Sequence, residues 1–208
     1  RTAPAVKKNA VLGYGAEVIL CEPTLEAREK TVAGVREKHG AIFIHPYNDY
    51  KVIAGHASIV LEIMSPTPNP SPKGRETNRT HASSPFINEG LAHLDFIISP
   101  VGGGGLISGI ALATHFLSPK TMVIGAEPER AGDAALSLKT GKIQPSRNPD
   151  TIADGLLTSL GDKTFPIISK YVKEIITVSE DEIISAMRLI WERMKIIVEP
   201  SSSVTLAA

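Results

Sequence analysis

The sequence predicts an α/β protein in which a parallel, twisted sheet carries helices on its faces. Strand-like and helix-like patterns alternate along most of the 208 residues. In addition, residues 101–109 (VGGGGLISG) place four consecutive glycines between a short β-branched run and a run with helical spacing. Strands that lead through glycine turns into helices are typical of parallel sheets, whose connections need a helix to return the chain.

The individual elements follow from hydrophobic spacing and from residues that favour helix ends. The opening residues 1–15 enter a helical pattern, and Thr24 and Gly40 are suited to begin and end an amphipathic helix. Pro200 is suited to the first turn of a last helix. The predicted strands are 17–21, 41–45, 95–101, 121–126 and 174–178, and the further predicted helices are 24–40, 52–63, 106–116 and 181–195.

Composition and charge exclude several classes of partner. Hydrophobic residues make up 42% of the chain, enough for a substantial core. Lysine plus arginine equals aspartate plus glutamate at 22 each, so no net charge attracts nucleic acid or an acidic membrane. Cys21 is the only cysteine, which excludes an internal disulfide and a cysteine-based zinc site. With no signal peptide or bilayer-spanning apolar run, we expect a cytoplasmic protein.

Two features interrupt the regular alternation. Residues 65–85 contain five prolines and one glycine, with almost no apolar side chains, and we expect a mobile surface loop there. At both ends the chain starts or stops within a helical pattern. We therefore expect the sequence to be a piece of a longer chain.

The tetraglycine predicts a phosphate site. Unpaired N–H groups at the start of a helix converge there, and the helix dipole favours negative charge. A P-loop is excluded because no lysine follows the glycines. A dinucleotide fingerprint fits poorly, although Glu127 lies about 20 residues onward, where a ribose-binding acid belongs. A glycine-rich linker is the third alternative.

The stretch EPERAGD carries a second candidate site. The carboxylates of Glu127 and Asp133, with the carbonyl of Ala131 between them, offer three oxygen ligands to a hard cation. The alternatives are a solvated acidic turn and a helix N-cap at Asp133. The six histidines lack the spacing of known metal motifs.

Several motifs together resemble the serine racemase and serine/threonine dehydratase family of pyridoxal-phosphate enzymes, which has the fold type II, tryptophan synthase β-like architecture. The motifs, in order, are TAPAVKKNAVLGYGAEVILCEPT, PVGGGGLISGIA, GAEPERAGDA, TIADGL and WERMKIIVEPSSS. The resemblance covers nearly the whole chain outside the 65–85 loop. It implies that residues 1–48 are part of a small domain and residues 49–208 most of a large, cofactor-binding domain.

The resemblance also implies roles for individual residues. Backbone N–H groups of the tetraglycine and the next residue would bind the cofactor phosphate, and three further residues would line the cofactor site. The cofactor residues so implied are Gly102, Gly103, Gly104, Gly105, Leu106, Asp154, Gly155 and Glu199. Mg²⁺ or Ca²⁺ would bind at Glu127, Ala131 and Asp133. An ATP effector would contact Lys7, Ala10 and Tyr14, for which an ordinary amphipathic surface is an equal alternative.

The implied function is chemistry at the α-carbon of a small amino acid, serine or threonine, in a homodimer. The reaction would be racemisation or dehydration. No lysine of this chain matches the family position that binds the cofactor, so we assign no catalytic residue beyond Glu199 as a candidate, and expect these 208 residues alone to be inactive. Two alternatives stay open: an inactive, truncated relative that acts as a binding or subunit-interaction module, and a nucleotide-binding dehydrogenase domain.

Overall fold

The computed structural model describes residues 4–22, 24–64 and 94–208, and the predicted 65–85 loop lies outside them. Contacts divide the chain into two compact units, residues 1–44 and residues 45–208. The second unit contains the sheet, the tetraglycine and the EPERAGD stretch, and the first unit contains the predicted effector residues.

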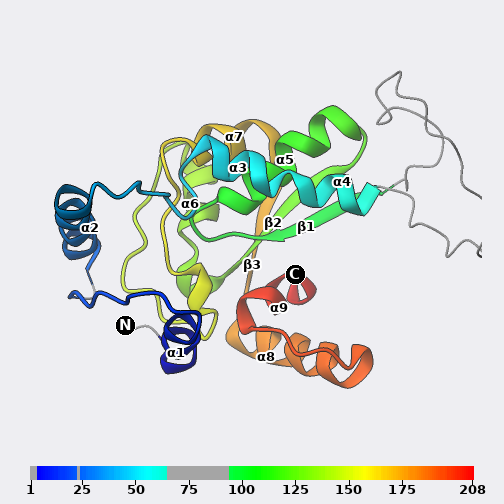
Figure 1. The fold of residues 1–208 in the computed structure, drawn as a ribbon. Coiled ribbons are helices and arrows are strands. Elements are labelled where there is room, and N and C mark those ends of the chain that lie inside the picture. The colour runs from blue at the N-terminus through cyan, green and yellow to red at the C-terminus, as the bar shows by residue number, and fades with distance from the viewer. Residues whose placement is uncertain (1–3, 23, 65–93) are drawn as a thin grey trace, which may run out of the picture. The chain divides into compact units, whose positions relative to one another are not determined.

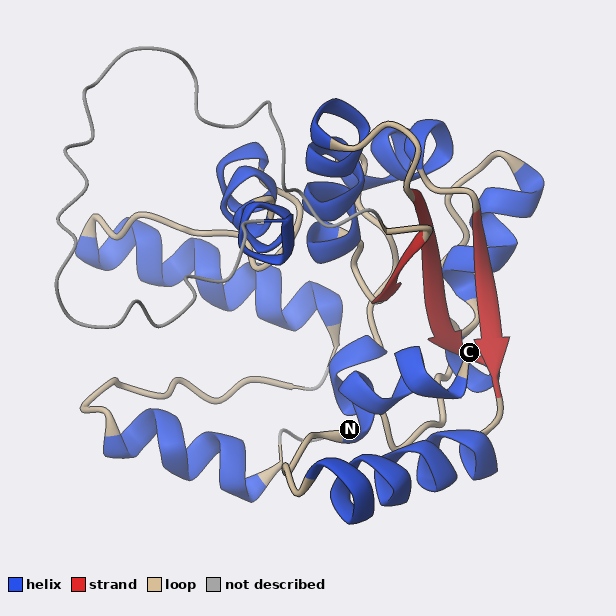
Figure 2. Ribbon diagram, turned by 90° about the vertical axis from the view of Figure 1, so that its right-hand side faces the viewer, coloured by secondary structure: helices blue, strands red, loops and turns tan. Residues whose placement is uncertain are grey.

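Three parallel strands form the sheet of the second unit, in the order β1-β2-β3 (Figure 2). They are β1 (Phe96–Pro100), β2 (Met122–Pro128) and β3 (Glu174–Val178). All three coincide with predicted strands, which confirms the parallel α/β class. Because parallel strands end at a common edge, the residues that follow β1 and β2 are brought close together there.

Helices cover both faces of this sheet (Figure 1). On one face α5 packs against β1 and β2, with α3, α4 and α7 packed around α5. On the other face α9 contacts β1 and β2 and is backed by α8. These helices are α3 (Tyr50–His56), α4 (Ser58–Met64), α5 (Gly105–Leu117), α7 (Thr164–Tyr171), α8 (Glu180–Leu189) and α9 (Pro200–Ala207).

The two faces have separate apolar cores. Ile107, Val123 and Ile168 belong to a cluster on the α5 face, and Val178, Ile183 and Val204 to a smaller one on the α9 face. Each of these six side chains is at most 3% exposed. Removing a side chain of this size from water contributes about 1.5 to 3 kcal/mol, so the burial of such residues fixes α5 and α9 on the sheet.

Most predicted helix ends are confirmed. The hydroxyl of Thr24 accepts a hydrogen bond from the Ala27 N–H, and Gly40 ends α2 (Leu25–His39) in the left-handed conformation. Pro200 occupies the first turn of α9, as predicted. The opening helix is α1 (Ala5–Gly13).

Two predicted helices differ in detail. The helix predicted over 52–63 is two short helices, α3 and α4, separated at Ala57. The helix predicted over 181–195 is α8 followed by a π-helical turn at Ile190–Met194. The short helices α6 (Asp133–Thr140) and α7 were not predicted.

The predicted strands 17–21 and 41–45 are wrong. Neither segment pairs with another strand in the described parts of the chain. Ile42 and Ile44 are 90% and 73% exposed, so the apolar alternation that suggested a strand is not buried here. A strand requires a neighbour to accept its backbone hydrogen bonds, and hydrophobic alternation alone does not supply one.

Within the described residues, no helix is both long and apolar enough to cross a membrane.

Candidate functional site

The tetraglycine connects β1 directly to α5. Gly104 is the N-cap of α5, with φ +86°, and its carbonyl accepts the first helical hydrogen bond from Ser108, at 3.0 Å. No group in the described part of the chain accepts a hydrogen bond from the N–H of any residue from Gly102 to Leu106. Five successive donors therefore surround the start of an apolar helix, the arrangement that binds phosphate.

Tyr47 packs against two glycines of the turn. A Cβ on Gly103 would overlap the Tyr47 ring, and a Cβ on Gly105 would lie 2.8 Å from the Tyr47 Cα. Both glycines are buried. Since these Cα atoms touch protein while their N–H groups have no internal acceptor, the glycine turn is a packed structure and not a linker.

Gly104 and Gly102 also contact the rest of the fold, Gly104 more closely. A Cβ on Gly104 would lie 2.8 Å from Ile168 Cδ1, and its positive φ is strained for any residue with a side chain. A Cβ on Gly102 would lie 3.2 Å from the Gly155 carbonyl oxygen. The turn is thus built into the core on three sides.

Three further predicted site residues meet at this turn. Asp154 and Gly155 belong to a single 3₁₀ turn, η2 (Asp154–Leu156), which lies against Gly102. The Gly155 N–H donates to the Ser201 hydroxyl, at 3.1 Å, and a Cβ on Gly155 would lie 3.4 Å from Glu199 Oε1. The structure therefore brings Glu199 and Gly155 together beside the tetraglycine, and their roles toward a cofactor stay predictions.

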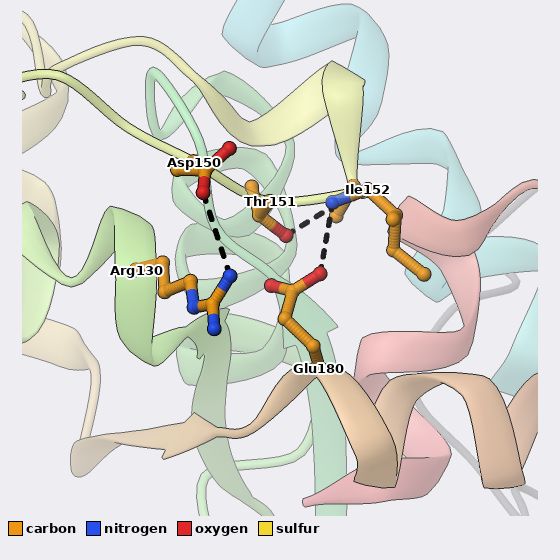
Figure 3. A network of polar contacts seen from close by, with 6 residues as sticks. Arg130, Asp150, Thr151, Ile152 and Glu180 are labelled. Carbon is orange, nitrogen blue, oxygen red and sulfur yellow. Dashed lines mark hydrogen bonds and ion pairs between the residues drawn. The ribbon is translucent and has the colours of Figure 1, made fainter.

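The segment that leads to Asp154 is held by polar contacts with two elements and by a bond within itself (Figure 3). The Ile152 N–H donates to Glu180 Oε2 of α8, at 2.9 Å. The Ala153 N–H donates to Thr151 Oγ1, at 3.1 Å, and Arg130 Nη1 lies 3.4 Å from Asp150 Oδ2. Because Thr151 and Ala153 are also buried, this loop is fixed in place where it meets the glycine turn.

The predicted cation residues form a buried acidic pair. Glu127 lies in β2 and is 1% exposed. Its carboxylate accepts hydrogen bonds from the N–H groups of Ala134, at 3.2 Å, and Ala135, at 2.6 Å, in the first turn of α6. Since Glu127 is directed into the protein, the alternative in which it binds a ribose is not supported.

Asp133 is the first residue of α6 and is 8% exposed. Its Oδ2 has no hydrogen-bond partner in the described structure. The pair is buried rather than solvated, and Gly132, not Asp133, is the N-cap of α6, while cation binding by the pair stays a prediction. Burial raises the pKa of Glu127 to about 8 and that of Asp133 to about 6, since water no longer stabilises their negative charge.

The surroundings of the pair fit a hard cation. Ala131, in the 3₁₀ turn η1 (Glu129–Ala131), is 5% exposed and lines the same cavity of about 370 Å³ as Asp133 and Ser146. An unpartnered carboxylate oxygen beside a cavity large enough for water suits Mg²⁺ or Ca²⁺, which bind carboxylates, carbonyls and water. Among the described residues, no three histidine, cysteine, aspartate or glutamate side chains are placed so that they could hold a metal ion together.

The predicted effector residues lie in the first unit. Lys7 and Ala10 are exposed residues of α1, and Tyr14, at its C-cap, is 88% exposed. The Tyr14 N–H donates to the Ala10 carbonyl, at 3.0 Å. Their spacing of three and four residues places them along one side of the helix, and their role stays a prediction.

Sequence reasoning missed three residues that shape the glycine turn: Tyr47, Thr164 and Ser201. Thr164 Oγ1 donates to the Gly103 carbonyl, at 2.9 Å. Tyr47 and Thr164 contact the glycine turn directly, and Ser201 contacts Gly155 beside it. Each contact spans at least 40 positions of sequence, which no local pattern reveals.

Comparison with known proteins agrees with this geometry. The family model described as "Pyridoxal-phosphate dependent enzyme" matches residues 1–208, and the chain belongs to this family. Its sheet and flanking helices are those of the fold type II members.

Among curated relatives, the chain is 46% identical over 208 residues to the serine racemase of Dictyostelium discoideum, covering 99% of this chain and 57% of that protein. It is 42% identical over 207 residues to the β-hydroxyaspartate dehydratase of Paracoccus denitrificans strain Pd 1222, covering 100% of this chain and 58% of that protein. The solved structure of maize serine racemase superposes with a TM-score of 0.84 at 36% identity, covering 100% of this chain and 56% of that one. The chain thus spans little more than half the length of the relatives it matches.

Proposed function

We propose that the protein containing this chain is a pyridoxal-phosphate-dependent serine racemase or serine (threonine) dehydratase, acting at the α-carbon of a small amino acid. The observation that carries the proposal is the tetraglycine, whose N–H groups are unpaired while its Cα atoms are packed against protein. Relatives named serine racemase and a relative named dehydratase support the reaction class.

The residues of this chain fit the phosphate end of the cofactor. The N–H groups from Gly102 to Leu106 would bind the phosphate, helped by the dipole of α5. Asp154, Gly155 and Glu199 would line the site beside it. When bound, pyridoxal phosphate supplies an electron sink for the negative charge that forms at the substrate α-carbon. Glu199, the candidate acid of this site, would influence protonation there.

A divalent cation belongs to the same proposal. Mg²⁺ or Ca²⁺ would bind Glu127 and Asp133 with the Ala131 carbonyl, and water would complete its coordination. The support is the buried, unpartnered oxygen of Asp133 next to a cavity.

The remaining features of the proposal concern regulation and assembly. An ATP effector would contact Lys7, Ala10 and Tyr14, supported by their exposure along one side of α1. We further propose a cytoplasmic homodimer in which residues 1–48 are part of the small domain and residues 49–208 most of the large domain.

The proposal is tested by incubating the protein that contains this chain with L-serine, pyridoxal phosphate and Mg²⁺. Chiral chromatography measures D-serine, and coupled absorbance with lactate dehydrogenase measures pyruvate. We expect one or both products. Absence of both, with the protein folded and cofactor bound, would contradict the proposed reaction. Co-purification with a longer homologue, without cofactor binding, would favour the binding-module alternative.

A further inference from the structure

We propose that Asn48 is a positioning residue for the phosphate site, because it holds Tyr47 against the tetraglycine. The inference rests on the proposed binding of pyridoxal phosphate at this turn. It assigns a function to residues that precede α3 in sequence and are remote from every motif that indicated the cofactor.

The orientation of the glycine N–H groups depends on packing. Within the described residues these groups have no internal acceptor, so no hydrogen bond of their own fixes their direction. In addition to the hydrogen bonds to the Gly103 and Gly104 carbonyls, contact with Tyr47 confines Gly103 and Gly105, since the ring covers one Cα and the Tyr47 backbone the other. A shift of Tyr47 would therefore let the donors turn away from a common point.

Asn48 fixes the backbone next to Tyr47 by bonds from both ends of its amide. Its Nδ2 donates to Asp162 Oδ1, at 2.6 Å, and its Oδ1 accepts from the Lys163 N–H, at 3.0 Å. The Asn48 carbonyl also accepts from Lys163 Nζ, at 3.3 Å. A Cβ on Gly161 would overlap the Asn48 side chain, so the residue is enclosed by the segment it binds.

The same segment binds the tetraglycine directly. The Gly161 N–H donates to Thr164 Oγ1, at 2.9 Å, and that hydroxyl donates to the Gly103 carbonyl, also at 2.9 Å. Residues 161–164 therefore hold Gly103 through Thr164 and hold Tyr47 through Asn48. The contacts close a ring in which each member limits the movement of the next.

A closed ring of this kind pre-orders the phosphate site. When donors are already oriented, binding does not have to order a loop, and affinity is higher for the same hydrogen bonds. Loss of Asn48 should reduce binding of the phosphate specifically, and leave contacts with the pyridine ring as they were.

The experiment measures the dissociation constants of pyridoxal phosphate and of pyridoxal for the protein containing this chain and for its Asn48→Ala variant. The Kd of pyridoxal divided by the Kd of pyridoxal phosphate reports how much the phosphate contributes to affinity. We expect Asn48→Ala to lower this ratio about tenfold, the order of effect expected when two hydrogen bonds of a half-buried amide are removed. Lys163→Met is the comparison variant, because it removes the side-chain bond to the Asn48 carbonyl and the contact with the Tyr50 ring but keeps both amide bonds of Asn48. We expect a change of less than about twofold.

Circular dichroism and thermal unfolding establish that each variant is folded. If Asn48→Ala does not fold, Thr164→Val replaces it, because it removes the hydroxyl that links Gly161 to Gly103 while keeping the shape of the side chain. An unchanged ratio in a folded variant, whether or not both affinities fall together, would overturn the inference. Failure of the unsubstituted protein to bind either compound would instead overturn the proposed function.

Discussion

At the residue scale, the four glycines are required for two different reasons. In the proposed site their unpaired N–H groups would receive a phosphate, and their Cα atoms allow Tyr47 and the α7 region to approach. The first reason is readable from sequence. The second depends on which residues the fold brings to the turn.

Substitution of Gly104 measures how much the close packing around the turn contributes to stability. We expect Gly104→Ala to destabilise the protein by about 1 to 3 kcal/mol more than Gly141→Ala, because both have positive φ but only Gly104 has Leu160, Thr164 and Ile168 within 3.0 Å of an added Cβ. Gly141 has nothing within 4 Å and isolates the cost of the backbone conformation. Urea unfolding gives both free energies, and equal values would show that the turn is not tightly packed.

The acidic pair leads to a second prediction at this scale. Saturating Mg²⁺ or Ca²⁺ should raise the thermal midpoint, and a cation at about 100 times its Kd contributes about 2.7 kcal/mol. Glu127→Gln should abolish this shift because it removes a ligand charge. Glu192→Gln, which removes an exposed charge that does not line this cavity, should preserve it. Scanning calorimetry with and without a chelator makes the comparison, and an identical cation response in both variants would contradict the site.

At the element scale, α8 begins with a capping box that connects two side chains and two backbone groups. The Ser179 hydroxyl accepts a hydrogen bond from the Glu182 N–H, and the Glu182 carboxylate accepts one from the Ser179 N–H, at 2.7 Å. This cap starts α8 immediately before Glu180, whose carboxylate accepts from Ile152. The start of α8 therefore also fixes the loop that reaches the glycine turn.

The capping box predicts a pH dependence. The Ser179 N–H, followed by its hydroxyl, holds the pKa of Glu182 below its ordinary value of 4.5. The folded state thus favours the ionised carboxylate, so this stabilisation is present above about pH 4.5 and is lost as the pH falls through the lowered value. Urea unfolding at several acidic pH values should show a steeper loss of stability in the unsubstituted protein than in Glu182→Gln. Equal slopes would contradict the assignment.

Element by element, the sequence predicted what local chemistry determines. The three paired strands and the ends of α2 and α9 were correct because β-branched runs, Thr24, Gly40 and Pro200 act on their own neighbourhood. The strands at 17–21 and 41–45 were wrong because pairing requires a neighbour. Helices α6 and α7 were missed because eight residues are too few for a clear helical period.

At the scale of the whole molecule, the fold places the glycine turn and the acidic pair at the same end of adjacent strands, β1 and β2. Sequence and resemblance indicated both groups of residues. They did not indicate Tyr47 or Asn48, since those residues reach the turn only through contacts with residues more than 50 positions away. The motifs of the candidate site could therefore be predicted from the sequence. The packing contacts that orient those motifs could not.

The most direct test is a titration of the purified chain with pyridoxal phosphate, followed by the absorbance of the cofactor, with NADH titrated in parallel. We predict saturable binding of pyridoxal phosphate that inorganic phosphate displaces, and no comparable binding of NADH. Absence of saturable pyridoxal-phosphate binding by the folded chain, or tight binding of NADH in its place, would contradict the assignment of the tetraglycine as the cofactor's phosphate site.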